Sequence, residues 1–490
     1  MITTKFSAIY MLIIVASVIT GCTASSTDPE KLQKPYVAKN ILFIAIDDLR
    51  PELNSFGAKH IHSPNIDALA AQSRIFRNHF VNAPSCGPSR FSLLTGRYGP
   101  TSNDALKFRA RALKKDSKDI PPSMPEWFKK QGYTTVSVGK ISHYAGGKMG
   151  KNWDDPKQLE MPNSWTETVM PVGKWGTPKG MMHGLAHGEI RVNPSDMDVY
   201  QSKNGDDNIY PDGLIADAAI EKLGHLTSNT DTPFFLAVGI IRPHLPFGAP
   251  RKYLDLYDDV EFPEIAFPLK PQGLSTWTAS HELRRYNLWG KDPLQDKEFA
   301  QDVRRHYAAS VSYADAQVGK ILTALKKFGA DKNTIVVLWG DHGWNLGEHA
   351  IWGKHNLFEE AIRAPLLISY PDIPKPGVAT DAVVETTDIF STLTQLTGLP
   401  EPAFSHGQSI VEQVNDPSKK GRAAYAYWRN SHTLREGSFR LTRFGDRGIA
   451  LYDLSSTEKE TKNIANEYPG IVEKMLRTLN GKIKQNDVFN

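Results

Sequence analysis

The sequence is poor in cysteine, with only Cys22 and Cys86 among its 490 residues. Two cysteines can form at most one disulfide, which excludes a disulfide framework and requires a packed core for stability. The chain also lacks a large charge of either sign, since its formal net charge is +4. It has no Lys/Arg tract with interleaved aromatic residues, no internal repeat and no low-complexity segment. These absences argue against nucleic acid as a partner.

The apolar run at the N-terminus, residues 8–19, is too short to span a bilayer comfortably and is typical of a signal peptide. The run leads into the segment Ile19-Thr20-Gly21-Cys22, which resembles a bacterial lipobox. The resemblance implies a lipoprotein signal peptide over residues 1–22, a lipidated Cys22 and a polar tether over residues 23–38. A plain secretory signal with an incidental cysteine is the alternative. Both readings predict export. The first also predicts a lipid anchor in a bacterial cell-envelope membrane, in the periplasm or at the cell surface.

The rest of the chain, about 450 residues, is long enough for one large α/β domain and a smaller appendage. Four apolar or β-branched runs are predicted as strands: residues 40–46, 133–138, 233–240 and 334–339. Helices are predicted over residues 212–226 and 302–328, and from Ser63 with Phe76 still at helical spacing. Strands that alternate with helices predict a parallel, doubly wound sheet.

Polar side chains follow closely after these strands: Asp47 and Asp48, Lys140 and His143, His244, and Asp341 and His342. In a doubly wound sheet, ligands bind beyond the carboxyl ends of the strands. Asp47 and Asp48 repel each other unless a cation holds them, and a hard divalent metal ion would do so. Taken singly, the aspartates suit a solvated strand end or a helix cap, Lys140 a surface charge and His244 a structural histidine. Their shared position at one sheet edge predicts a binding site instead.

Cys86 lies in the stretch Pro84–Arg97. Pro88 suits the first turn of a helix, which places Cys86 at the helix N-terminus, among unpaired N–H groups. Arg90 adds a positive charge one turn on, and Gly96 can end the helix with a positive φ. This pattern predicts a position suited to an anion. The alternative is that Cys86 is a small buried apolar residue.

The motif C-x-P-x-R followed by S-L-L-T-G-R, residues 86–97, resembles the signature of the type I sulfatases. Further segments resemble that family, and most closely its iduronate-2-sulfatase type: Asn40–Arg50, Val138–Lys140 with His143, Pro243–His244, and Asp341–Trp344 with Leu346–His349. The resemblance implies an alkaline-phosphatase-like doubly wound sheet in a catalytic domain over residues 39–400. It also implies a smaller C-terminal α+β subdomain over residues 401–490. Short strands and a final helix are expected there, over residues 423–428, 438–444 and 471–479.

In the type I sulfatases the motif cysteine is oxidised to formylglycine, an aldehyde whose hydrate supplies the nucleophilic oxygen. The resemblance therefore implies a formylglycine derived from Cys86 and a maturation enzyme that makes it. It also implies one calcium ion held by five residues: Asp47, Asp48, Cys86, Asp341 and His342. Many sulfatases have asparagine in place of His342. His143 follows Lys140 by three residues rather than the commoner two, as in the iduronate type.

The same resemblance implies roles for the remaining polar side chains. Arg90, Lys140 and Lys354 would bind the sulfate oxygens together with the metal ion. The formylglycine hydrate would attack sulfur and form a covalent sulfo-enzyme. His244, with Lys354, would protonate the departing sugar oxygen. His143 would take the proton from the second hydroxyl, which expels sulfate and regenerates the aldehyde.

The expected substrate is a sulfated, uronate-containing polysaccharide or oligosaccharide. Two long loops, residues 146–212 and 250–292, contain tryptophans that can stack on sugar rings or simply pack. A phosphate- or phosphonate-ester hydrolase of the same superfamily is one alternative, because the sequence does not distinguish a singly from a doubly charged tetrahedral group. An inactive, glycan-binding lipoprotein is another, although a binding protein has no need of a nucleophile at Cys86.

Overall fold

The computed structural model of the chain describes Met1, residues 40–115 and residues 120–487. Apart from Met1, the predicted signal peptide and tether lie outside these described residues. Contacts divide the chain into residues 1–36 and residues 37–490, and every element named below belongs to the second unit. Among the described residues, each helix is too short or too polar to span a bilayer.

A sheet of eight strands forms the centre of the fold, in the order β14-β2-β13-β10-β1-β8-β3-β6. Its strands are β1 (Asn40–Ile46), β2 (Arg74–Phe80), β3 (Thr134–Gly139), β6 (Glu167–Val169), β8 (Phe234–Ile240), β10 (Thr334–Gly340), β13 (Leu366–Ser369) and β14 (Ala379–Glu385). The four strands predicted from the sequence are the neighbours β10, β1, β8 and β3, and they pair in parallel. These predictions are confirmed.

One strand of the sheet runs against the others, and one predicted helix is shorter than expected. Strand β13 pairs antiparallel with both β10 and β2. Helix α1 (Pro64–Ala70) begins as predicted but ends before Phe76, which belongs to strand β2. The prediction for residues 73–76 is therefore wrong. Phe76 pairs with Leu366 of β13, and this pairing across the sheet prevails over helical spacing.

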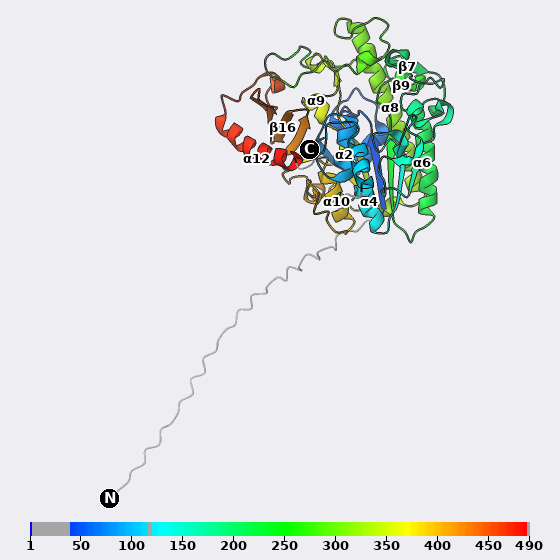
Figure 1. Ribbon diagram of the computed structural model, residues 1–490, viewed down its shortest axis with the longest axis horizontal. Coiled ribbons are helices and arrows are strands. Elements are labelled where there is room, and N and C mark those ends of the chain that lie inside the picture. Colours follow the sequence, from blue (N-terminus) through cyan, green and yellow to red (C-terminus); the bar gives the residue numbers. More distant parts are fainter. Residues whose placement is uncertain (2–39, 116–119, 488–490) are drawn as a thin grey trace. The chain divides into compact units, whose positions relative to one another are not determined.

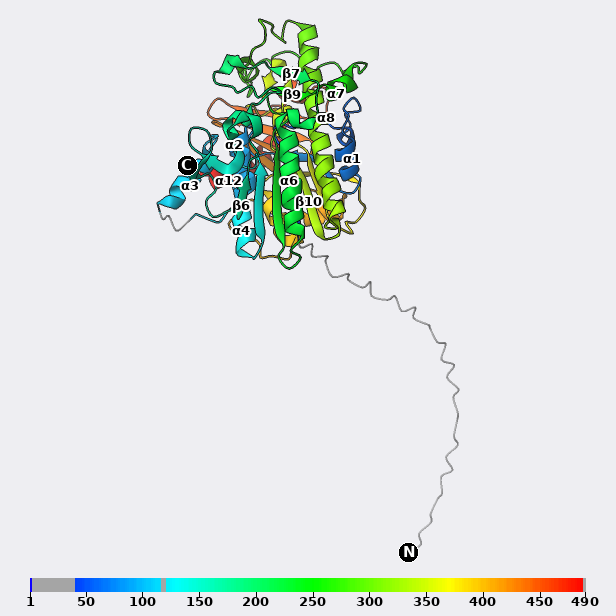
Figure 2. The ribbon, with the colours of Figure 1, turned by 90° about the vertical axis from the view of Figure 1, so that its right-hand side faces the viewer.

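Helices cover both faces of the sheet, as a doubly wound fold requires (Figure 1). Helices α6 (Pro211–Thr227) and α8 (Lys297–Lys327) lie side by side along one face (Figure 2). On the other side lie α2 (Cys86–Thr95), α4 (Met124–Lys130) and α10 (Asp388–Leu396). Further α-helices are α3 (Ala105–Lys114), α5 (Pro178–Met182), α7 (Arg251–Leu254), α9 (Glu359–Ile362) and α11 (Val411–Asn415). Short strand pairs in the loops are β4 (Lys148–Met149) with β5 (Asp155–Leu159), β7 (Tyr200–Lys203) with β9 (Phe247–Pro250), and β11 (Asn345–Leu346) with β12 (Trp352–Gly353).

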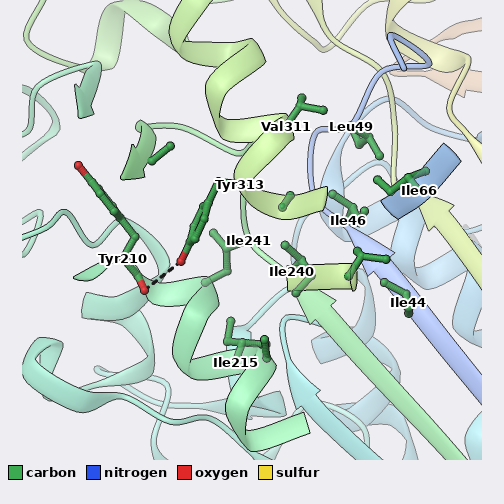
Figure 3. Packing of buried hydrophobic residues seen from close by; sticks show 14 of the residues in the cluster. Ile44, Ile46, Leu49, Ile66, Tyr210, Ile215, Ile240, Ile241, Val311 and Tyr313 are labelled. Atoms are coloured by element: carbon green, nitrogen blue, oxygen red, sulfur yellow. Dashed lines mark hydrogen bonds between the residues drawn. The ribbon is translucent and has the colours of Figure 1, made fainter. Parts of the chain in front are cut away.

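Strand β1 is buried on both faces, which fixes where its carboxyl end lies. Ile44 and Ile46 pack in the apolar core that includes Val311 of α8 (Figure 3). Phe43 points to the other face and stacks on Phe235, with ring centroids 6.5 Å apart. Alternation between two buried faces explains why the strand reads as an unbroken apolar run. The residues that follow β1 are therefore held by a rigid element.

A second, antiparallel sheet lies in the C-terminal part of the chain. Its strands are β15 (Ala424–Trp428), β16 (Ser431–Glu436), β17 (Phe439–Phe444) and β18 (Ile449–Asp453), and helix α12 (Pro469–Asp487) packs against it. Lys482 Nζ lies 2.7 Å from the Tyr98 hydroxyl and 3.3 Å from Glu385 Oε1. This contact ties α12 to the main sheet. The smaller α+β part is confirmed, and its boundary at residue 400 stays a prediction.

Candidate active site

The polar residues predicted at the strand ends meet at one edge of the sheet. Ile46 of β1 is in register with Gly340 of β10 and with Ile240 of β8. The Asp47 N–H donates to the Ile240 carbonyl at 3.1 Å, and the Asp341 N–H donates to the Ile46 carbonyl at 3.2 Å. The ladder thus extends one residue past β1 and β10, and it places the carboxylates of Asp47 and Asp341 beside each other.

Cys86 lies at the first position of helix α2, as predicted, and its side chain is buried at this edge. Its Sγ lies 3.3 Å from Lys354 Nζ, 3.4 Å from His342 Nε2 and 3.9 Å from Asp48 Oδ1. Burial, with the negative charge of Asp47, raises the pKa of the Cys86 thiol well above its ordinary value. The unmodified side chain is therefore a protonated thiol and a poor nucleophile.

Arg90, one turn further along α2, donates hydrogen bonds to two of the carboxylates of the site. Its Nη2 lies 3.0 Å from Asp47 Oδ1, and its Nε lies 3.0 Å from Asp341 Oδ2. Nη1 donates to the carbonyls of Lys140 and Ile141. The guanidinium is completely buried. Its hydrogen bonds join residues that follow the three strands β1, β3 and β10.

The pKa values of the aspartates diverge because their neighbours differ. Although burial opposes ionisation, Lys140 and Arg90 hold the pKa of Asp47 well below its usual range, and Lys140 Nζ forms an ion pair with it. Burial raises the pKa of Asp48 well above its usual value, despite Lys354, and Asp47 adds repulsion. Burial, together with Asp47, raises the pKa of Asp341 to about 7. The edge therefore packs three buried carboxylates against three cations, Lys140, Lys354 and Arg90, and burial favours the protonated forms of Asp48 and Asp341.

This cluster of buried carboxylate oxygens fits a divalent cation. Asp47, Asp48, Cys86 and His342 each offer one ligand atom, and these atoms all lie within 4.8 Å of one another. Asp48 Oδ2 is buried without a hydrogen-bond partner. The His342 Nδ1–H donates to the Gly343 carbonyl at 2.9 Å, which leaves the Nε2 lone pair facing the cluster. Asp341 borders the cluster, with its Oδ1 3.6 Å from His342 Nε2.

The ammonium of Lys354 contacts Cys86, Asp48 and Glu282. Its Nζ lies 2.7 Å from Asp48 Oδ1 and 3.3 Å from Glu282 Oε1. His244 Nε2 lies 3.9 Å from the same Glu282 oxygen. The His244 Nδ1–H donates to the Leu245 carbonyl at 2.6 Å, so Nε2 is the nitrogen that can accept or deliver a proton.

His143 lies near this group without a direct contact to it. Its Nδ1 is buried and makes no hydrogen bond, and its ring lies 5.3 Å from that of Tyr144. Burial and the charge of Lys140 lower the pKa of His143 to about 3, which keeps the imidazole neutral. A neutral imidazole with a free ring nitrogen is able to accept a proton.

Sequence reasoning missed Glu282, whose carboxylate reaches the centre of the site. It lies on the long loop after α7, where no periodic pattern marks any residue as functional. The only available signal is the length of that loop, since long loops inside a domain are usually functional.

The doubly wound sheet has the alkaline-phosphatase-like fold, and its strand ends gather buried carboxylates, cations and a cysteine in a cluster that suits a metal ion. The family model described as "Sulfatase" matches residues 39–399, and the chain belongs to that family. It is accordingly a sulfuric ester hydrolase. A second model, "N-sulphoglucosamine sulphohydrolase, C-terminal", matches residues 347–486.

Several known proteins are similar to the chain over most of its length. A sulfatase of Formosa agariphila is 32% identical over 468 residues, which cover 90% of this chain and 86% of that protein. The iduronate 2-sulfatase of Homo sapiens is 32% identical over 407 residues, 74% of this chain and 70% of that protein. A protein solved with its substrate D-glucosamine-2-N,6-O-disulfate has a TM-score of 0.69 at 20% identity, over 91% of this chain and 98% of that one. The phosphonate monoester hydrolase of Agrobacterium radiobacter gives 0.69 at 21% identity, over 91% and 96%. These two structures show the shared fold.

Proposed function

We propose that this sulfatase hydrolyses sulfate monoesters on a sulfated, uronate-containing oligosaccharide or polysaccharide, through a formylglycine oxygen derived from Cys86. The observation that carries the proposal is the position of Cys86 at the head of α2, against Lys354 and His342 and beside the carboxylates of Asp47 and Asp48. The similarity to the iduronate 2-sulfatases of human and mouse supports a sulfated uronate as the substrate.

The nature of position 86 supports oxidation of the cysteine. The thiol is buried and its pKa is raised, so it does not provide a thiolate. A formylglycine at the same position would supply an oxygen nucleophile.

We assign the metal site to Asp47, Asp48, His342 and the modified residue 86, with Asp341 as the fifth ligand. When bound, calcium would act as a Lewis acid toward the sulfate oxygens and offset the buried carboxylates. The nitrogen of His342 is an unusual partner for so hard a cation, although its Nε2 faces the cluster.

The lysines of the site would hold the sulfate group. Lys354 lies within 3.3 Å of Cys86 Sγ, so its ammonium reaches any group held against residue 86. Lys140 forms an ion pair with the neighbouring carboxylate of Asp47. The sequence prediction gave Arg90 a sulfate-binding role as well. The donors of Arg90 are directed at Asp47, Asp341 and two carbonyls, and we therefore infer that it positions the metal ligands.

Proton transfer falls to the two histidines. His244 in its doubly protonated form, with its Nδ1–H fixed on a carbonyl and its Nε2–H facing Glu282, would deliver the Nε2 proton to the departing sugar oxygen, assisted by Lys354. An alkoxide is a poor leaving group, and this proton makes its departure possible. The neutral His143, with its free Nδ1, would accept the proton that releases sulfate.

Peptide mass spectrometry across Cys86, on protein purified from its own host, tests the nucleophile. We expect the mass of an aldehyde in place of the thiol, and we expect Cys86→Ala to abolish turnover while the protein remains folded. Sulfatase activity that survives in Cys86→Ala would refute the proposed nucleophile.

A panel of esters tests the substrate class. Sulfated uronate saccharides should be turned over faster than sulfated hexosamines, and both faster than matched phosphate and phosphonate esters. A preference for the phosphorus esters would identify the protein instead as a hydrolase of that chemistry.

We further propose that the protein is exported and lipid-anchored through Cys22, that a maturation enzyme modifies Cys86, and that catalytic and C-terminal regions divide near residue 400. The signal and Cys22 lie outside the described residues. Metabolic labelling with a radioactive fatty acid should mark the wild type and not Cys22→Ala. Labelling of both, or of neither, would contradict the anchor.

A further inference from the structure

Glu282 is an acidic side chain at the catalytic centre to which the proposed mechanism assigns no step. Its Oε1 lies 3.3 Å from Lys354 Nζ and 3.9 Å from His244 Nε2. One carboxylate oxygen of Glu282, one of Asp48 and a ring nitrogen of His244 all lie within 4.8 Å of one another. The ammonium of Lys354 lies between Asp48 and Glu282 and forms an ion pair with each, so this group of atoms already contains a cation.

The loop that carries Glu282 is packed directly on the backbone before Lys354. Gly353 has a φ of +140°, and a Cβ there would lie 2.2 Å from Ser280 Oγ and 3.8 Å from Glu282 Cβ. Only glycine permits this approach. This packing holds the loop that carries Glu282 in a fixed position relative to Lys354.

The second oxygen of Glu282 lacks a partner. Oε2 is buried without a hydrogen bond, and Nδ1 of His355 lies 3.9 Å from it. The His355 ring is held elsewhere, stacked on Trp428 at 5.2 Å and 3.4 Å from Ser85 Oγ. A distance of 3.9 Å is too long for a hydrogen bond. A buried carboxylate oxygen in this state requires a donor, and the described residues around it provide none within range.

The chemistry of the substrate identifies the donor. A sulfate ester carries acceptor oxygens and no proton at neutral pH, so a carboxylate repels it. A sugar hydroxyl next to the sulfate ester donates a hydrogen bond readily. Oε1 of Glu282 contacts both Lys354 and His244, which would hold the sulfate and protonate the leaving oxygen. The same carboxylate would therefore lie close to the carbon beside the sulfated one.

We propose that Glu282 is a specificity-determining residue that accepts a hydrogen bond from a free hydroxyl on the carbon next to the sulfated carbon. This inference rests on the proposed sulfated-sugar function and refines it. Sugars that carry a second sulfate, or no hydroxyl, at that neighbouring carbon are poor substrates, because the carboxylate repels the first and finds no donor in the second.

Kinetics with a matched pair of probes tests the proposal. The probes are methyl 2-O-sulfo-iduronoside and its 3-deoxy analogue, or the equivalent pair for whichever panel sugar is preferred. The mature wild-type enzyme should favour the hydroxylated probe in kcat/KM by about 10- to 100-fold, the range expected of a hydrogen bond to a charged group. Glu282→Ala should reduce this ratio to about one, and Glu282→Gln should leave an intermediate ratio.

A matched control separates this role from a general loss of charge or fold. Glu126→Gln removes a carboxylate from the first turn of α4 and should keep the wild-type ratio. Glu282→Gln has nearly the same shape as the native side chain, so it decides the matter if Glu282→Ala fails to fold. An unchanged ratio in folded, active Glu282 variants overturns the inference and leaves the sulfatase proposal intact. A mature wild-type enzyme that turns over no sulfated sugar overturns both.

Discussion

The Nε atom of Arg90 lies 3.0 Å from Oδ2 of Asp341, and both side chains are completely buried. The same guanidinium reaches Asp47 at 3.0 Å, so one cation sets the spacing between the carboxylates that follow β1 and β10. Arginine suits this position because its planar fork binds two acceptors at fixed angles, which a lysine ammonium does not do.

Arg90→Lys is predicted to weaken metal binding and activity together. Lysine keeps the charge but cannot bridge Asp47 and Asp341, so the ligand spacing is lost. We expect divalent-ion affinity to fall by about tenfold or more, in line with other residues that orient metal ligands. Isothermal titration with calcium measures it. Arg74→Lys is the control, because Arg74 is equally buried but binds only carbonyls, away from the metal site. Equal calcium affinity in wild type and Arg90→Lys would contradict the prediction.

Gly239→Ala is predicted to displace Lys140. A Cβ on Gly239 would lie 2.0 Å from the Lys140 carbonyl oxygen, and neither backbone can yield without breaking the pairing of β8 with β3. We expect a loss of about 1–3 kcal/mol in the free energy of unfolding, as for other overpacked cores, and a parallel loss of kcat.

Gly481→Ala in α12 provides the comparison for that experiment. A Cβ there meets nothing within 4 Å, and alanine favours a helix by about 0.5–1 kcal/mol. Urea unfolding and turnover are measured on both variants. A Gly239→Ala enzyme as stable and active as Gly481→Ala would show that the sheet edge tolerates more movement than its packing indicates.

The sequence predicts the central strands and most of the site because both follow local rules. The central strands are apolar or β-branched runs followed closely by polar residues, such as Asp47 or Asp341. Pro88 lies in the first turn of helix α2 and Gly96 follows its last residue, positions that proline and glycine generally favour. This pattern places Cys86 at the first position of the helix.

Other features depend on contacts between distant segments. Residues 73–76 fit helical spacing, yet pairing with β13 makes them part of a strand. An arginine can bind a sulfate or a carboxylate equally well, so the sequence does not predict the partner of Arg90. In the fold, Arg90 binds the carboxylates of Asp341 and Asp47. Glu282 reaches Lys354 because Ser280 packs on Gly353, a contact that leaves no periodic trace in the sequence.

His79 is predicted to make stability depend on pH between about 4 and 6.5. Its ring is buried, with its two nitrogens 3.0 Å from the Ala364 carbonyl and 3.0 Å from the Thr386 hydroxyl, and burial lowers its pKa from 6.5 to about 4. In this range the unfolded chain binds a proton that the folded protein does not. His79 therefore contributes a loss of stability as pH falls from 6.5 to 4, of at most about 1.4 kcal/mol per pH unit.

Urea unfolding at a series of pH values measures this dependence. His79→Gln should be less stable at neutral pH but should lose stability less steeply than the wild type as the solution is acidified. His225→Gln, which replaces an exposed histidine of α6, should follow the wild-type slope. Parallel curves for wild type and His79→Gln would rule out His79 as the source.

Removal of the metal ion is predicted to lower both activity and the unfolding temperature. Without a cation, the buried carboxylates of Asp47, Asp48 and Asp341 repel one another, and a ligand that binds only the folded state contributes to stability by mass action. Dialysis against a chelator should abolish turnover and lower the melting temperature by a few degrees. Calcium should restore both in the wild type and neither in Asp48→Asn. Full activity after verified removal of all divalent ions would exclude the metal from the reaction.

The backbone N–H of Asp48 donates to Oδ1 of Asp341 at 2.9 Å, although the two residues are 293 positions apart in the sequence. Closing so long a loop costs the chain conformational entropy, and contacts between segments far apart in the sequence form slowly. Asp48 and Asp341 meet only after strands β1 and β10, which precede them, have paired in the sheet. Catalytic competence is therefore one of the last properties that the chain acquires. After dilution from denaturant, turnover should return more slowly than helical circular dichroism, and fragments that lack either end of this span should recover helix without recovering any activity.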